Sequence, residues 1–181
     1  MRDLRAPAVL VAALVLSGCG FHPLYAVPGA ARGSMKQDLG SIYVEPVPDR
    51  LGYDLRNTVI DLIDGRAEPA GATYSLRMTL GLKNEPIGVQ SQIVGSGATA
   101  ITQTVITRYN DTLTVSYDLI DRKTNTVIAH GIETDLSSYN VLASPYATLV
   151  DQQDADQRAA DEIADRLRID LAAYFARGAQ K

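Results

Sequence analysis

Two residue types that support much of enzyme chemistry are almost missing from this chain. Its 181 residues include one cysteine, Cys19, and two histidines, His22 and His130. One cysteine cannot form a disulfide within the chain, and it cannot supply a cysteine metal cluster by itself. His22 lies next to the N-terminal cysteine region, whereas His130 lies in a predicted strand, where we expect a structural role. Disulfide, thiol and histidine-metal chemistry are therefore unsupported.

Phosphate-binding and carboxylate chemistry are unsupported as well. Gly95-Ser96-Gly97 lacks the outer glycines of a nucleophile elbow and the lysine of a phosphate loop, so we interpret it as an ordinary loop. Acidic residues recur between positions 151 and 162, but side chains two apart on a helix diverge and cannot easily share one ion. We interpret this series as a solvated face: Asp151, Asp154, Asp156, Asp161 and Glu162. The chain is therefore expected to be no enzyme and to need neither a metal nor a soluble cofactor.

The N-terminal region has the three parts of an export signal. Arg2 and Arg5 precede an apolar stretch at 6–16, and small residues follow it. The apolar stretch has 11 residues, whereas a membrane-spanning helix needs about 20. We therefore expect residues 1–18 to be removed as a signal peptide.

The end of this segment, Leu16-Ser17-Gly18-Cys19, resembles the lipobox of bacterial lipoproteins. The resemblance implies cleavage between Gly18 and Cys19, a diacylglycerol thioether on the cysteine and an acyl group on its amine. Three acyl chains would anchor the protein permanently, because each buried methylene contributes about 0.8 kcal/mol. An ordinary signal peptide followed by a chance cysteine is the alternative.

The rest of the chain has the length of one domain. Residues 19–40 are rich in glycine, proline and alanine without periodicity, which predicts a lipidated N-terminus followed by a flexible tether. We expect a single folded domain over 41–177 and a short C-terminal tail at 178–181. The net charge of −4 argues against a nucleic-acid partner.

Hydrophobic alternation divides the domain into four strands. Apolar and polar residues alternate in a way that predicts strands over 41–45, 73–83, 112–121 and 126–136. The charged segment 121–125 predicts a hairpin turn between the last two strands. Segment 90–107 is interpreted as a flexible turn that leads into a strand.

Two amphipathic helices complete the predicted domain. The first has an apolar stripe, and Asp49 can cap its start while Gly65 can close it. The second starts after Ser144, with Pro145 in its first turn, and ends near Phe175. Its middle is poor in large apolar residues, so it either projects beyond the domain or covers the sheet only with three alanines: Ala155, Ala159 and Ala160.

The element order β-α-β-β-β-α predicts an α+β fold. Because the strands and helices are each apolar on one side, we expect a two-layer sandwich, with two helices packed on one face of a four-stranded mixed sheet. The other face of the sheet would be rich in serine and threonine. That face is either solvated or a contact surface inside a partner.

Several segments resemble one known family. The start of the predicted mature chain, Gly18-Cys19-Gly20-Phe21-His22-Pro23-Leu24-Tyr25, is similar to the opening of the lipopolysaccharide-assembly lipoproteins (LptE-like) in their alphaproteobacterial form. Four later segments are similar to the same group, at 117–121, 138–142, 146–150 and 171–175. The resemblance spans nearly all of the mature chain.

The resemblance implies a function in the outer membrane. The chain would be a lipid-anchored outer-membrane protein on the periplasmic side, lodged one-to-one in a large LptD-like β-barrel, where it supports barrel assembly and delivers lipopolysaccharide to the outer leaflet. Gly20 after the lipidated cysteine is compatible with sorting to that membrane. The alternative is a generic periplasm-facing lipoprotein that acts as a binding or adaptor module of an envelope transport system.

Direct contact with lipopolysaccharide would need cations. Some members of the family contact its phosphates through basic residues near the start of the last helix, but segment 134–157 contains no lysine or arginine here. The remaining candidates for this contact are Arg108, Arg122 and Lys123, because phosphates are bound by cationic donors. Ordinary surface cations are the competing interpretation.

Overall fold

The computed structural model describes Gly33 and residues 36–178. The predicted signal peptide, Cys19 and most of the predicted tether lie outside these residues. The elements are β1 (Ile42–Val44), α3 (Arg50–Ile63), β2 (Tyr74–Val94), a short 3-10 helix (Gly97–Thr99), β3 (Ile101–Asp121), β4 (Thr126–Asn140) and α4 (Pro145–Gly178). Before β1, residues 36–39 form a helical turn and Leu39 packs on the core.

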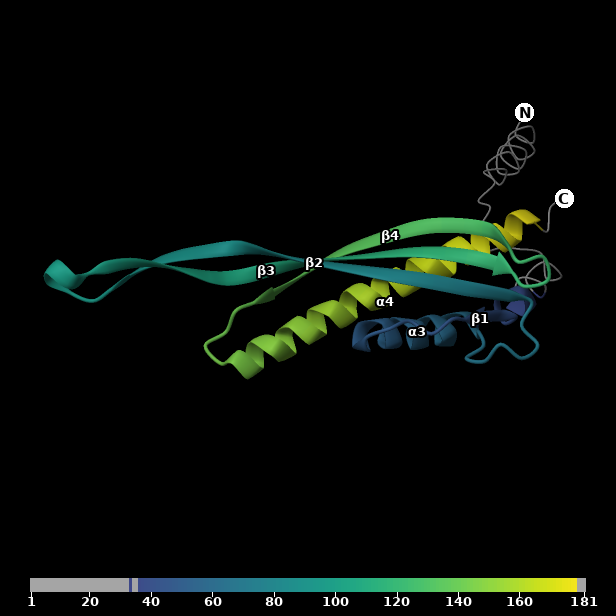
Figure 1. Ribbon diagram of the computed structural model, residues 1–181, viewed down its shortest axis with the longest axis horizontal. Coiled ribbons are helices and arrows are strands. Elements are labelled where there is room, and N and C mark those ends of the chain that lie inside the picture. The colour runs from purple at the N-terminus through teal and green to yellow at the C-terminus, as the bar shows by residue number, and fades with distance from the viewer. Residues whose placement is uncertain (1–32, 34–35, 179–181) are drawn as a thin grey trace, which may run out of the picture.

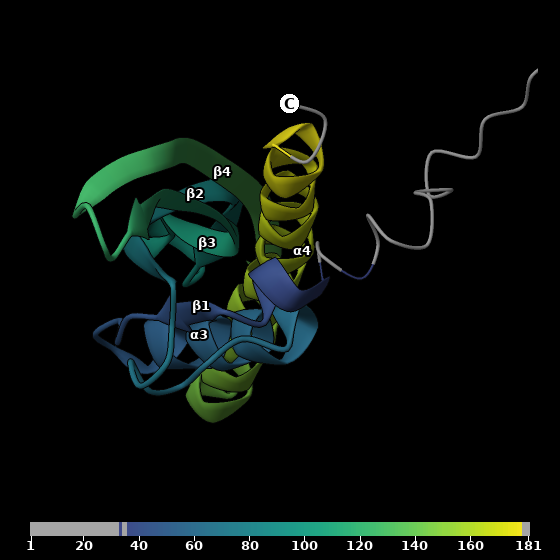
Figure 2. The ribbon, with the colours of Figure 1, turned by 90° about the vertical axis from the view of Figure 1, so that its right-hand side faces the viewer.

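The sheet is mixed and its strands lie in the order β1-β2-β3-β4 (Figure 1). β1 runs parallel to β2, and the two later pairs are antiparallel. Figure 2 looks along the long axis and shows α3 and α4 beside one another, both against the sheet. The predicted α+β sandwich, with two helices on a four-stranded mixed sheet, is confirmed.

The core forms where the apolar stripes of the helices meet the apolar face of the sheet. On β3, alternate residues are fully buried, and Leu113, Val115 and Leu119 show how the two-residue period puts one side of a strand into the core. On α3, Leu55 and Val59 lie one turn apart and are equally buried. Each such side chain contributes about 1.5–3 kcal/mol by leaving water.

The middle of α4 belongs to the core instead of projecting from it. Ala155, Ala159 and Ala160 are at most 1% exposed. Their small side chains allow α3 to approach α4 closely, and the hydroxyl of Thr58 donates to Oδ1 of Asp161 across the two helices at 3.3 Å. Of the two alternatives for this part of the helix, coverage by alanines is therefore the correct one.

The ends of α3 differ from the predicted caps. Asp49 occupies the N-cap position, but its side chain makes no capping hydrogen bond. The left-handed residue at the C-terminus is Asp64, with φ 51°. The amide of Gly65 then donates to the carbonyl of Ile60 at 2.9 Å, so the glycine contributes a backbone donor and not the turn itself.

Both central strands are much longer than predicted. β2 continues to Val94 and β3 begins at Ile101, so the predicted turn leading into a strand is correct for 95–107, but its assignment of 90–94 to a turn is wrong. The turn is confined to the segment between these strands, where Gly95 and Gly97 have φ values of 96° and 64°. The strands extend because each satisfies the backbone groups of the other. β4 also runs beyond 136, to Asn140.

Candidate functional site: an uncharged β-ribbon and its base

The two long strands leave the sheet together as a two-stranded ribbon, which we define as residues 86–107. β1 pairs with β2 only over Tyr74–Leu76, and β4 pairs with β3 only from Arg108 onward. Within the described part of the chain, residues 89–94 and 101–106 pair with each other and with no further strand. At roughly 3.3 Å per residue the ribbon extends about 30 Å beyond the sheet (Figure 1).

The ribbon starts at a kink with a specific sequence requirement. The register between β2 and β3 shifts on both sides of Gly88. A Cβ at this position would lie 2.6 Å from Oγ1 of Thr107 and 2.9 Å from Cβ of Arg108. Gly88 therefore permits the close approach of the two strands where they leave the sheet.

The composition of the ribbon is unusual for an exposed surface. Residues 86–107 contain no Asp, Glu, Lys or Arg, although 21% of the chain is charged. Large aliphatic side chains are nevertheless exposed on it: Ile87 51%, Val89 62%, Ile93 77%, Val94 45% and Ile101 64%. Gln accompanies these residues on one face, as in the opposed pair Gln92 and Gln103, and Thr on the other, as at Thr102 and Thr104. The ribbon offers uncharged hydrogen-bonding groups and aliphatic surface, and no charge.

A buried polar cluster holds the base of the ribbon against α4. Asp111 of β3 is fully buried. The side-chain amide of Asn84 donates to Oδ1 of Asp111 and, at 2.9 Å, to the hydroxyl oxygen of Tyr139. Tyr139 stacks on Tyr109 with ring centroids 5.5 Å apart. Three strands are thereby joined at the point where the ribbon leaves the sheet.

The fourth member of this cluster comes from α4. Asp156 is 8% exposed, and Oδ1 of Asp156 and Oδ2 of Asp111 have no hydrogen-bond donor among the described residues. Burial and the neighbouring carboxyl of Asp111 raise the pKa of Asp156 to about 6, although the charge of Arg50 acts in the opposite direction. A proton on Asp156 that is donated to Asp111 would satisfy both oxygens and halve the buried charge.

This cluster corrects the interpretation of the acidic series. Asp154, Asp161 and Glu162 are exposed, as expected for a solvated face, but Asp156 is buried. The error arose because α4 lies deep against the sheet at this turn. The sequence does hold a signal, because Asn84 comes two residues after the apolar Leu82 and Asp111 two residues before Leu113. The two-residue period of a strand therefore predicts that both side chains point to the apolar face.

A second polar network fastens the C-terminal half of α4 to β4. The guanidinium of Arg166 donates to Oδ1 of Asp135 at 3.0 Å and to the carbonyl of Thr134 at 2.9 Å. The hydroxyl of Tyr117 donates to Oδ2 of Asp170 at 3.0 Å. Its ring lies over Gly131, where a Cβ would come within 2.5 Å of it. Burial, aided by Asp170, raises the pKa of Tyr117, so its hydroxyl remains a donor at neutral pH.

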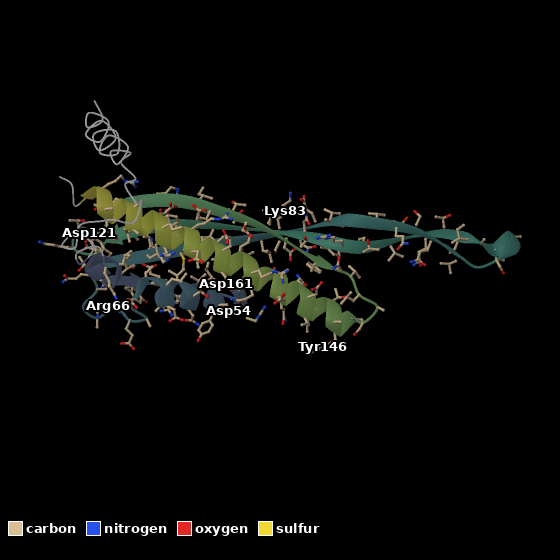
Figure 3. All side chains as sticks on the ribbon, turned by 180° about the vertical axis from the view of Figure 1, so that it is seen from behind. Asp54, Arg66, Lys83, Asp121, Tyr146 and Asp161 are labelled. Atoms are coloured by element: carbon tan, nitrogen blue, oxygen red, sulfur yellow. The ribbon has the colours of Figure 1, made fainter. Side chains whose placement is uncertain are left out.

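Apolar groups are also exposed elsewhere on the described residues, as at Ile132 and Leu136 on β4. The start of α4 presents Tyr146, 75% exposed, and the half-exposed Leu149 (Figure 3). Between the start of α3 and β2 lies an open groove of about 330 Å³, lined mainly by aliphatic side chains: Val47, Pro48, Leu51, Met78, Leu80, Leu82 and Leu113. The groove is at the small end of the range for ligand pockets.

The three predicted phosphate contacts do not form one site. Arg108 lies at the base of the ribbon, with its Nη2 donating to the hydroxyl of Ser138 at 2.8 Å. Arg122 and Lys123 lie in the β3–β4 turn, which Figure 3 places, beside the labelled Asp121, at the end of the molecule away from the ribbon. About 40 Å of strand separates the two positions. The guanidinium of Arg122 donates to the carbonyls of Pro69 and Ala72, so it also fixes a loop.

The surroundings of His130 and of Gly95-Ser96-Gly97 fit structural roles. Nδ1 of His130 lies 2.7 Å from Oδ1 of Asp118 on the neighbouring strand. Gly95-Ser96-Gly97 forms the tip of the ribbon, as the loop interpretation predicted. Over the described residues, no group of three or more His, Cys, Asp or Glu side chains could hold a metal ion, and no helix is long and apolar enough to cross a membrane.

Comparison with known proteins shows the family and the solved structures that this α+β domain resembles. The LptE (lipopolysaccharide-assembly) family model matches residues 39–171. An uncharacterized protein of Rickettsia prowazekii (strain Madrid E) is 25% identical over 169 residues, which cover 93% of this chain and 96% of that protein. A crystal structure described as a lipoprotein from Caulobacter crescentus CB15 has a TM-score of 0.61 at 24% identity, covering 80% of this chain and 98% of that one. A minor lipoprotein from Acinetobacter baumannii has a TM-score of 0.47 at 17% identity, over 73% and 88% of the two chains.

The likeness to the Caulobacter structure supports the α+β fold alone. Because the family model covers well over half of the sequence, the chain belongs to the LptE family of lipopolysaccharide-assembly lipoproteins. This family is not enzymatic and needs no cofactor. Its members work with the machinery that transports lipopolysaccharide.

Proposed function

We propose that this chain is the lipid-anchored plug and assembly subunit of a β-barrel lipopolysaccharide translocon in the outer membrane. The observation that carries the proposal is the match of residues 39–171 to the lipopolysaccharide-assembly family. The lipobox-like segment that ends at Cys19 supports anchoring by acyl chains. The chain would be lodged one-to-one in an LptD-like barrel, with its lipid anchor on the periplasmic side of the outer membrane.

The exposed surface of the ribbon is evidence for a large partner with an uncharged contact surface. A protein that worked alone in the periplasm would expose about 30 Å of uncharged, partly aliphatic strands to water, and such surfaces usually mark an interaction site. The inside of a barrel or the strands of its wall would cover both aliphatic and neutral hydrogen-bonding groups. A binding module that works without a protein partner would not need such an exposed surface.

The expected result is a stable complex. When the C-terminally tagged protein is extracted from outer membranes in mild detergent, a large β-barrel should co-purify in equal amounts and resist dissociation by moderate heat. The intact mass of the same preparation should start at Cys19 and include three acyl chains.

Recovery of the acylated protein without a barrel would contradict the plug function and favour the binding or adaptor module. One observation keeps that second candidate in view, namely the groove between α3 and β2, which has an aliphatic lining suited to a small apolar ligand. An intact mass without acyl chains would contradict the proposed lipid anchor. The proposed complex with the barrel would still be tested by the co-purification.

Direct contact with lipopolysaccharide phosphates is proposed for the β3–β4 turn. Lys123 is exposed there, and its replacement does not disturb the loop that Arg122 holds. Lys123→Glu should weaken binding of purified lipopolysaccharide roughly fivefold at low salt, by replacing an attractive charge with a repulsive one. Lys83→Glu on β2 serves as the charge-matched control. Equal affinities of the two variants would remove the turn from consideration, and Arg108 would remain as a separate candidate.

A further inference from the structure

The β3 edge of the ribbon continues a ladder that β4 leaves unfinished. β4 pairs with β3 up to the pair Asn140 and Arg108. One more backbone bond follows, from the amide of Val141 to the carbonyl of Thr107 at 2.9 Å. Beyond it, β3 runs on to Ile101 without a neighbour on that side among the described residues.

The segment after β4 is held away from this edge. The amide of Asn140 donates to Oδ2 of Asp151, and the amide of Leu142 donates to the hydroxyl oxygen of Thr148, both at 2.9 Å. These bonds tie the chain to the first turns of α4. The chain therefore does not continue beside β3, and about half of the backbone groups of 101–107 point to an empty position, since alternate residues of a strand face opposite edges.

The usual protection of an open edge is missing here. Exposed edge strands normally carry charges, often lysine, that prevent pairing with another chain. Segment 101–107 has none, and the next charged residue, Arg108, lies within the β3–β4 ladder. The opposite edge of the ribbon, 86–94, is uncharged too, but Pro86 and the ion pair of 2.6 Å between Lys83 and Glu85 lie at its start.

We propose that the β3 edge at 101–107 accepts an extended, uncharged strand of the barrel partner by β-augmentation, in the position that β4 leaves at Asn140. The inference rests on the proposed function, because it takes the barrel as the source of the strand. The open backbone groups favour an extended strand over other ligands, because they pair with the backbone of that strand. Ile101, Gln103 and Val105 favour uncharged side chains on the added strand, since a charge buried beside them would lack a counter-charge. Seven residues, about 23 Å, match the length of an ordinary strand.

Amide hydrogen exchange of the purified complex and of the protein alone tests the pairing. In the complex, the amides of 101–107 that face the open edge should exchange at least about 100-fold more slowly than in the protein alone, while 86–94 changes less. Contact through side chains only would leave these amides unprotected and would overturn the inference. Protection that grows with protein concentration in the absence of the barrel would assign the edge to a second copy of this chain and would also overturn it.

A matched pair of variants tests the choice of edge. Gln103 on β3 and Gln92 on β2 face each other across the ribbon. Gln103→Lys places a charge next to the added strand and should reduce the recovered barrel about tenfold, whereas Gln92→Lys, one strand further away, and the neutral Gln103→Thr should reduce it less than threefold.

The outcomes separate this inference from the proposed function. If the wild-type protein recovers the barrel and Gln103→Lys recovers it equally well, the β3 edge is not the docking site although the plug function stands. Equal losses with Gln103→Lys and Gln92→Lys would show that the ribbon acts through its faces and not its β3 edge. If the wild-type protein recovers no barrel, both proposals fall.

Discussion

Asp156→Asn should stabilise the protein at pH 8 by about 2 kcal/mol and should remove the fall in stability between pH 4 and 6 that Asp156 causes. In the folded protein the pKa of Asp156 is raised from 3.8 to about 6. The folded state therefore binds this proton more tightly than the unfolded state does. The resulting stabilisation is complete below about pH 4, falls as the pH rises through 6, and is worth roughly 3 kcal/mol for two pKa units.

Asparagine provides the missing donor without the charge. Its amide can donate to Oδ2 of Asp111, which has no donor in the described structure, so the bond no longer depends on a proton from solution. Thermal unfolding at pH 4.5 and pH 8 measures the effect, and 2 kcal/mol corresponds to about 4–8 °C in a chain of this size. Asp154→Asn is the control, because Asp154 lies on the same helix but is exposed and pairs only with Arg158.

The opposite result would be equally informative. If Asp156→Asn destabilised the protein at pH 8 while Asp154→Asn did not, the two buried carboxyl groups would have to be held by something that needs both negative charges. Proton donation from Asp156 to Asp111 would then be the wrong description of the cluster.

Gly131→Ala should destabilise the protein by about 2–3 kcal/mol. A Cβ at this position would lie 2.5 Å from the ring of Tyr117, and that ring cannot simply turn into solvent because it is 6% exposed and its hydroxyl donates to Asp170. Displacing the ring costs packing and leaves buried polar groups without their bond. Urea or thermal unfolding of the purified variant measures the loss.

Gly81→Ala is the matched control for this substitution. Gly81 is also a strand residue, but no atom lies within 4 Å of its added Cβ. Alanine loses less conformational freedom on folding than glycine does, so this variant should be as stable as the wild-type protein or about 0.5 kcal/mol more stable. If both alanine variants unfolded at the same temperature, the close contact between Gly131 and Tyr117 would not constrain the fold.

The predictable parts of the fold are those that local patterns determine. Alternation in β2 and β3 and the stripe of α3 placed both kinds of element correctly, and one-sided strands with one-sided helices have few other ways to bury their apolar faces. The ribbon was missed because its sequence, rich in Thr, Gln and Gly, alternates weakly. Only the presence of the facing strand decides that 90–94 is extended.

The candidate site was predicted less well than the fold for the same reason. The cluster of Asn84, Asp111, Tyr139 and Asp156 comes from four elements, and no spacing along the chain connects them. The absence of charge from 86 to 107 was visible in the sequence, but it gained meaning only when the structure showed those residues exposed.

The sequence by itself determined the element order, the apolar faces and the family, because these depend on residues close in the chain or on the order of short motifs. The tertiary structure decided that β2 and β3 extend beyond β1 and β4, that Asp156 is buried, and that Arg108 is far from Lys123. These three facts depend on which distant segments pack together. Backbone pairing and burial are satisfied between elements, and a local pattern does not specify the partner.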